Sequence, residues 1–203
     1  MQRRDGRDII ANQRTNNQID PGMLYLAAVL NPVPLSLSAN QGSPAAVLVG
    51  LQQQAEGWHV VMTRRARHLA HHAGQISFPG GKVEPNDTNL VATALREAQE
   101  EIALSPSAVT IIGALDIVTS PVGFVVQPVV GLIAPEAVFV ASPDEVEEVL
   151  VLPLVDVLEP TRHRRESYLS EGVRREVWVI DNADHYLWGL SASILVDLTG
   201  RYR

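Results

Sequence analysis

An amphipathic helical pattern at residues 86–104, set among short segments rich in β-branched residues, constrains the fold more than any other feature of the chain. Its apolar positions recur at helical spacing and define one face that must be buried, formed by Leu90, Ala94, Leu95, Ala98 and Ile102. Asp87 or Thr88 can cap its start, and Pro106 ends it. One helix covering strands in this way predicts an α+β domain.

Strands are predicted on both sides of that helix. A hairpin is expected from 45–51 and 58–65, and further strands at 75–78, 109–118, 124–134 and 176–181. The remaining predicted elements are a short helix within 24–30 followed by a loop, a mixed strand and short helix over 145–159, a charged loop at 162–166 and a closing helix at 187–198. We therefore expect one domain over residues 23–203, preceded by a polar arm, residues 1–22.

Composition excludes several classes of chemistry and of partner. The 203 residues contain no cysteine, so disulfide frameworks, thiolate metal sites and cysteine nucleophiles are excluded. The N-terminus lacks the apolar stretch of a secretory signal, and the most apolar segment, 124–141, is too interrupted to span a membrane, so we expect a cytoplasmic protein. Sixteen Lys and Arg against 23 Asp and Glu leave a net charge of −7, which argues against nucleic acid or a membrane surface as a partner.

Three glutamates share one face of the predicted helix. Glu97, Glu100 and Glu101 stand at positions i, i+3 and i+4, so their carboxylates lie close together and repel one another. A divalent cation would convert that repulsion into a site of hard oxygen ligands, whereas a solvated acidic surface is the alternative. The paired glycines Gly80 and Gly81, which precede the helix, favour the metal site because backbone without side chains can approach a metal or phosphate closely.

A basic segment leads into those glycines. Residues 57–83 contain no acidic side chain but hold four cations and four histidines: Arg64, Arg65, Arg67, Lys82, His59, His68, His71 and His72. Because side chains alternate along a strand, at most one of Arg64 and Arg65 can face the acidic helix. A zinc site at the histidines is disfavoured, since no acidic or thiol ligand lies among them. The segment instead suits a small phosphorylated ligand.

Together, Gly81, Arg96-Glu97 and Glu100-Glu101 resemble the Nudix box, the strand-loop-helix signature of hydrolases that cleave a diphosphate linked to another moiety. Two positions depart from the general pattern: Asp87 replaces the usual loop glutamate, one residue further from Arg96, and Ala103 replaces the usual glycine after the acidic pair. The resemblance implies the Nudix fold, an α/β/α sandwich with a mixed central sheet.

The longer stretch MTRRARHLAHHAGQISFPGGKVEPND is similar to the extended signature of the coenzyme A pyrophosphatase subfamily, which also has the extra loop residue. The matching elements are Thr63-Arg64, His72 to Gln75, Phe78 to Gly81 and Asp87, with further similarity at 143–146, 153–154 and 188–190. The resemblance implies hydrolysis of coenzyme A, and of acyl-CoA as a further candidate, to adenosine 3′,5′-bisphosphate and 4′-phosphopantetheine.

The same resemblance implies roles for individual residues. Glu97 and Glu101 are the expected ligands of Mg²⁺ or Mn²⁺, with Glu100 as a third ligand and the Gly81 carbonyl as a fourth. Arg96 is expected to orient a glutamate. The general base is left open between Glu100 and a later glutamate, for which Glu145, Glu147 and Glu148 are candidates.

Substrate contacts are less narrowly defined. Arg64, Arg67, His72 and Lys82 are candidates for the phosphates, while Tyr168, Tyr186 and Trp188 either stack on adenine or belong to the core. Three alternatives stay open: a Nudix hydrolase of another nucleoside diphosphate derivative such as ADP-ribose or a dinucleotide, a nucleotide-binding Nudix domain without catalysis, and a structural domain whose acidic face is only surface. The expected partner is a small molecule, and a homodimer is left open.

Overall fold

The structure is a computed structural model that describes residues 20–34, 36, 42–170, 172–182 and 185–202. Most of the predicted arm lies outside the described residues, and Pro21 already begins the first helix, α1 (Pro21–Val29), which confirms the short helix expected there. Among the described helices, none has the length and apolar character needed to span a membrane.

A mixed sheet of eight strands forms the centre of the domain. Its main path runs β3 (Ile76–Ser77), β2 (Gly57–Arg65), β1 (Ser43–Gln54), β7 (Phe124–Ile133) and β5 (Val109–Ala114), while β4 (Gly80–Lys82) pairs with β1, β6 (Val118–Thr119) with β7 and β8 (Val146–Pro153) with β2. Strands β1 and β7 are parallel and the other pairs are antiparallel.

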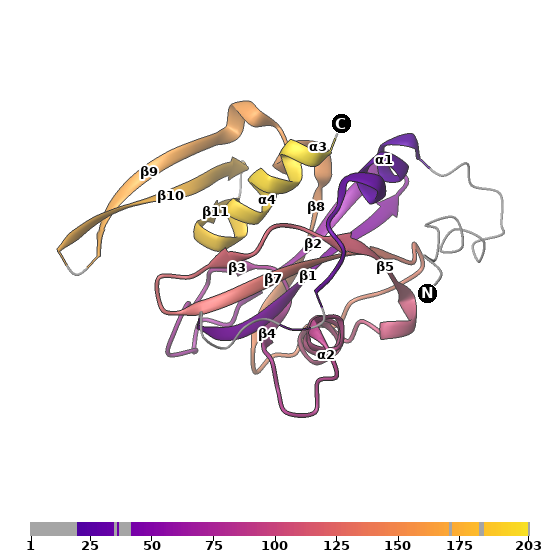
Figure 1. Ribbon diagram of the computed structural model, residues 1–203, viewed down its shortest axis with the longest axis horizontal. Helices are drawn as coiled ribbons and strands as arrows, with labels where there is room; N and C mark the ends of the chain where they lie inside the picture. The colour runs from indigo at the N-terminus through magenta and orange to yellow at the C-terminus, as the bar shows by residue number, and fades with distance from the viewer. Residues whose placement is uncertain (1–19, 35, 37–41, 171, 183–184, 203) are drawn as a thin grey trace.

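Helices cover both faces of this sheet (Figure 1). On one face, α2 (Leu90–Ile102) packs against side chains such as Ala46 and Leu48. On the other, α1, α3 (Leu154–Val157) and α4 (Gly189–Arg201) pack against Val49 and Leu51. Because strand side chains alternate, β1 supplies both cores at once. The α/β/α arrangement with a mixed central sheet is thus confirmed.

Helix α2 buries the face that its sequence pattern predicts. Leu90, Ala94, Ala98 and Ile102 are almost completely buried, and Leu95 packs at the edge of the same core. Its cap differs from the expectation, since the side chain of Asn89, rather than that of Asp87 or Thr88, accepts a hydrogen bond from the Ala92 N–H at 2.9 Å. Asp87 has another function in the site.

The C-terminal region is where the prediction of elements is least accurate. Of residues 162–166, expected as a loop, 163–166 begin strand β9 (His163–Ser170). Strand β10 (Val173–Asn182) pairs with β9 on one side and with β11 (His185–Trp188) on the other, which forms a second sheet. The β9–β10 hairpin projects from the body of the domain (Figure 1), so its exposed strand carries charged residues and has no apolar alternation. The predicted helix at 187–198 starts only at Gly189, because Leu187 and Trp188 complete β11.

Two smaller differences concern the central sheet. The expected strand at 109–118 is divided into β5 and β6, and β4 was not predicted. Strands at 45–51, 58–65, 75–78 and 124–134 and the strand with short helix at 145–159 are confirmed as β1, β2, β3, β7 and β8 with α3, with shifts of a few residues at their ends.

Ala103 ends α2 in a left-handed conformation, with φ 55°, at the position where the Nudix pattern has glycine. A Cβ in this conformation is unfavourable, so Ala103→Gly should raise the free energy of unfolding by about 0.5–1 kcal/mol. Urea unfolding measures the difference. Ala92→Gly, inside the right-handed part of α2, is the matched control and should lower stability; a loss of stability in both variants would contradict the assignment.

Candidate active site

The Gly80-Gly81 pair lies where β4, β1 and α2 meet. In the antiparallel register Gly80 is opposite Val47 and Gly81 opposite Ala46. A Cβ on Gly80 would lie 2.6 Å from the Val47 Cα, and one on Gly81 would overlap the carboxylate of Glu97. The absence of side chains therefore lets the backbone of β4 contact the acidic helix directly.

The three helix glutamates are not equivalent. The Glu101 side chain is only 3% exposed, and its Oε2 has no hydrogen-bond partner among the described residues. Glu97 is 14% exposed, whereas Glu100 is 55% exposed. Since an unsatisfied buried carboxylate oxygen is costly, the arrangement favours a ligand that brings positive charge to Glu101.

Burial also shifts the ionisation of the two inner glutamates. Burial raises the pKa of Glu101 to about 8, although Arg65 and a hydrogen bond from the Gly80 N–H oppose the shift. Burial raises the pKa of Glu97 as well, against the opposing effect of Arg96. A group of perturbed carboxyls in one place is typical of a functional site.

Arg96 connects the loop before α2 with the glutamates. Its guanidinium donates to both carboxylate oxygens of Asp87, at 3.0 and 3.1 Å, and to the carbonyl of Lys82 at 3.0 Å. It also contacts Glu97 Oε1 at 3.0 Å and Glu100 Oε2 at 2.9 Å. Arg96 thus lies against two of the predicted metal ligands, as an orienting residue would.

Asp87 holds Arg96 in this position. Partial burial acts to raise the pKa of Asp87, but hydrogen bonds from Arg96, the Glu84 N–H and the Thr93 hydroxyl together hold it below its ordinary value. The carboxylate therefore stays charged beside the guanidinium. Sequence reasoning considered Asp87 only as a cap and missed this contact, which joins residues nine positions apart.

Arg65, rather than the predicted Arg64, is turned toward the acidic cluster. The pairing of β2 with β8 shifts register between these two residues, and an irregularity of this kind redirects side chains. The guanidinium of Arg65 lies 3.8 Å from Glu101 Oε1, whereas Arg64 contacts Glu148 at 3.3 Å and His185 at 3.2 Å. Alternation along the strand had limited the choice to one of the two arginines but could not select it.

Among the later glutamates and the other basic candidates, some lie near the acidic cluster and others pair with residues away from it. Glu145 lies near the end of α2, because its N–H donates to the Ser142 carbonyl at 3.0 Å and the Ser142 N–H donates to the Glu101 carbonyl at 2.9 Å; its charge adds to the effect of burial in raising the pKa of Glu97 and Glu101. Glu148 is paired with Arg64, and Glu147 accepts two hydrogen bonds from the exposed Arg67. The Lys82 ammonium lies 5.2 Å from the centre of the Phe124 ring. The structure therefore brings Glu145 to the site, and pairs Arg64 and Arg67 with carboxylates.

His68, His71 and His72 lie in the loop between β2 and β3, whereas His59 is buried within β2. His68 contacts the Asp144 carbonyl at 3.1 Å. His72 has a positive φ of 58°, and its Nδ1 lies 2.9 Å from Gln75 Oε1. Across the part of the chain that the structure describes, no group of three or more His, Asp or Glu side chains is arranged to hold a metal ion.

Even so, the donors at Glu97 and Glu101 fit a hard divalent cation. Both are carboxylates, one oxygen of Glu101 is buried without a partner among the described residues, and Gly81 lets the Glu97 carboxylate pack directly against the backbone of β4. Arg96 lies 3.0 Å from Glu97 Oε1, and Arg65 lies 3.8 Å from Glu101 Oε1.

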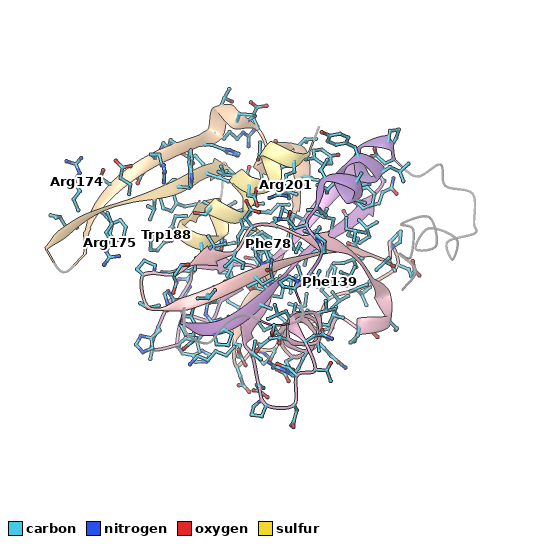
Figure 2. The ribbon with its side chains drawn as sticks, viewed as in Figure 1. Phe78, Phe139, Arg174, Arg175, Trp188 and Arg201 are labelled. Carbon is cyan, nitrogen blue, oxygen red and sulfur yellow. The ribbon has the colours of Figure 1, made fainter. Side chains whose placement is uncertain are left out.

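A pocket of about 510 Å³ adjoins the acidic cluster. Arg65, His72 and Gly80 are among its lining residues, and Arg65 and Gly80 also interact with the Glu101 carboxylate. A larger open groove at the far end of β1, lined by residues such as Gln54 and Phe139 (Figure 2), has no ionisable lining residue. The chemistry therefore points to the smaller pocket as the ligand site.

The buried carboxyl of Glu101 should make stability depend on pH. Because its native pKa is about 8 and its ordinary value 4.5, the native protein keeps a proton that the unfolded chain releases between these values. The free energy of unfolding of the metal-free protein should therefore fall as pH rises through this range, and Glu101→Gln should flatten the fall. Urea unfolding with a chelator across this pH range tests this. Glu100→Gln, which alters an exposed carboxylate, is the control; an unchanged slope in Glu101→Gln would contradict the assignment.

Comparisons with known proteins agree with this geometry. The NUDIX domain profile matches residues 42–173. Proteins of Salmonella dublin and Salmonella typhimurium, both named "Uncharacterized Nudix hydrolase NudL", are 40% identical over 170 residues, which cover 84% of this chain and 88% of theirs.

Solved structures with a similar arrangement include a C. elegans Ap4A hydrolase in a binary complex and the NUDIX domain of Shewanella oneidensis NrtR with ADP-ribose. The first is 19% identical, with a TM-score of 0.48, and covers 58% of this chain and 84% of its own. The second is 20% identical, with a TM-score of 0.47, and covers 76% of this chain and 87% of its own. With the domain match over 42–173 and the 40% identical relatives, the chain belongs to the Nudix family and is a hydrolase of that family.

Proposed function

We propose that the protein is a metal-dependent pyrophosphatase that hydrolyses coenzyme A to adenosine 3′,5′-bisphosphate and 4′-phosphopantetheine. The observation that carries the proposal is the position of Arg65, which lies between the buried carboxylate of Glu101 and the 510 Å³ pocket. A diphosphate bound in the pocket would contact the Arg65 guanidinium, and the acidic cluster would lie directly behind that guanidinium. The similarity of residues 62–87 to the coenzyme A pyrophosphatase signature supports the choice of substrate.

Glu97 and Glu101 would hold Mg²⁺ or Mn²⁺, with the Gly81 carbonyl and Glu100 as further ligands. A divalent cation bound by carboxylates neutralises phosphate charge and lowers the pKa of a bound water. Arg65 would bind a phosphate oxygen, and Arg96, fixed by Asp87, would keep the Glu97 carboxylate oriented. Glu145 would accept the proton of the attacking water, as the oxygen–phosphorus bond forms and the anhydride bond breaks.

Two other functions stay as alternatives. A Nudix hydrolase of another nucleoside diphosphate derivative, such as ADP-ribose or a dinucleotide, would use the same acidic cluster. The rates of hydrolysis of these compounds, compared with that of coenzyme A, decide between the two functions. A binding domain without catalysis has no use for a buried, self-repelling pair such as Glu97 and Glu101. The proposal includes a small-molecule substrate and a cytoplasmic location for the protein. Whether the protein forms a homodimer stays open.

Activity on coenzyme A should require the divalent cation and both inner glutamates. Glu97→Gln and Glu101→Gln should each lower kcat/KM by about 100-fold or more, because each removes charge that the reaction needs. Phosphopantetheine release with Mg²⁺, with Mn²⁺ and with a chelator measures this. Glu56→Gln, in the exposed turn between β1 and β2, is the matched control. Much faster turnover of ADP-ribose than of coenzyme A would overturn the substrate assignment.

The two neighbouring arginines provide a second test. Arg65→Ala should lower kcat/KM by about 100-fold, since it removes the cation beside Glu101, whereas Arg64→Ala should lower it by less than about tenfold. Steady-state kinetics on coenzyme A for both variants measure the difference. Equal losses, or a greater loss in Arg64→Ala, would show that the register shift in β2 does not select the phosphate ligand.

A further inference from the structure

The 510 Å³ pocket has two walls of different origin. One wall comes from the central sheet and the loop after β6, with residues such as Phe78, Val122 and Phe124. The other comes from the second sheet and α4, with residues such as Tyr168 and Trp188. Figure 2 shows Trp188 at the base of the β9–β10 hairpin, beside the start of α4. A ligand that reaches from the acidic cluster into the pocket would therefore lie between the two sheets.

Aromatic rings occur on both walls. Tyr168 and Trp188 form an edge-to-face pair with ring centres 6.4 Å apart and an interplanar angle of 84°. Both are only partly buried, so part of each ring faces the pocket. Phe124 lines the opposite wall, with the Lys82 ammonium 5.2 Å from its ring centre. Aromatic side chains that line a pocket in this way suit a flat ring with a π-system.

The charged residues of the pocket also distinguish between ligands. Two arginines, Arg65 and Arg165, line the pocket, the second on the wall formed by the hairpin. Glu176 is the one carboxylate among the lining residues. Arg165 itself lies 4.4 Å from the ring centre of Trp178. The pocket thus offers one further arginine, Arg165, in addition to the one beside Glu101. Of the two halves of coenzyme A, only the adenosine 3′-phosphate half combines an aromatic base with a further phosphate, whereas pantetheine has neither.

The aromatic wall lies largely beyond the NUDIX match, which ends at residue 173. Glu176, Trp188 and Leu190 all follow that boundary. The acidic cluster and the Gly80-Gly81 turn lie within it. Tyr168 of β9 lies within the match, whereas the part of the wall formed by β10, β11 and α4 lies almost entirely after it.

We propose that this pocket binds the adenine ring of the substrate against Trp188 and Tyr168, with the 3′-phosphate toward Arg165 and the pantetheine half outside. The assignment rests on the proposed function, because it names the half of coenzyme A that the same site recognises. Stacking of a base on an aromatic side chain contributes about 1–3 kcal/mol, which corresponds to about 5- to 150-fold in affinity.

Product binding to the metal-free full chain tests the assignment without turnover. Calorimetric titration with adenosine 3′,5′-bisphosphate should show affinity about 5- to 150-fold weaker for Trp188→Leu, and close to that of the wild type for Trp188→Phe, which keeps a ring. Affinity for 4′-phosphopantetheine should be the same in all three proteins. Tyr186→Phe is the matched control, because Tyr186 is an exposed aromatic of β11 whose hydroxyl bonds Glu166.

Fluorescence provides a second measurement. Adenosine 3′,5′-bisphosphate should quench the emission of a variant that keeps Trp188 as its single tryptophan, with Trp58 and Trp178 changed to Phe. Loss of 4′-phosphopantetheine affinity in Trp188→Leu, or unchanged nucleotide affinity and no quenching, would overturn the assignment. Nucleotide binding that depends on Trp188 in a protein that does not hydrolyse coenzyme A would instead contradict only the proposed function.

Discussion

The burial of the Glu101 carboxylate between α2 and the edge of the central sheet is the constraint on which the rest of the site depends. With its side chain 3% exposed and one oxygen unpartnered, this group is unfavourable in the folded protein unless a cation or a proton accompanies it. Glu97 beside it is held by Arg96, which Asp87 in turn holds. The unfavourable burial is therefore limited to Glu101, while Glu97, Arg96 and Asp87 are held by ion pairs and hydrogen bonds.

That constraint also explains the glycines and the register of β4. The Gly80 N–H approaches the Glu101 carboxylate, and the neighbouring Gly81 must lack a side chain because a Cβ there would occupy the position of the Glu97 carboxylate. The same close approach aligns β4 with Ala46 and Val47 of β1, so the acidic helix and the sheet are packed as one unit. The short strand, the paired glycines and the acidic helix thus depend on each other, and no one of them alone would define the site.

Much of this could be predicted from the sequence, and the remainder had identifiable physical causes. Period-3.6 spacing located α2 and its buried face, and β-branched runs located β1, β2 and β7, because each pattern reflects burial of one face. Strand β9 lacks that signal, since it belongs to a projecting hairpin whose charges face solvent and pair with one another, as Arg164 does with Glu166. Arg65 and Asp87 were assigned incompletely because a register shift and a contact nine residues apart leave no local pattern.

The structure separates catalysis from recognition while keeping them in contact. The acidic cluster depends on β1, β4 and α2, whereas the aromatic wall depends on β9, β10, β11 and α4, so a substitution in that wall need not disturb the glutamates. Arg65 is common to both, because it lies beside Glu101 and also lines the pocket. A phosphate bound at Arg65 would therefore fix the position of the bond to be cleaved, and the wall beyond it would determine which group attached to that phosphate can be accommodated.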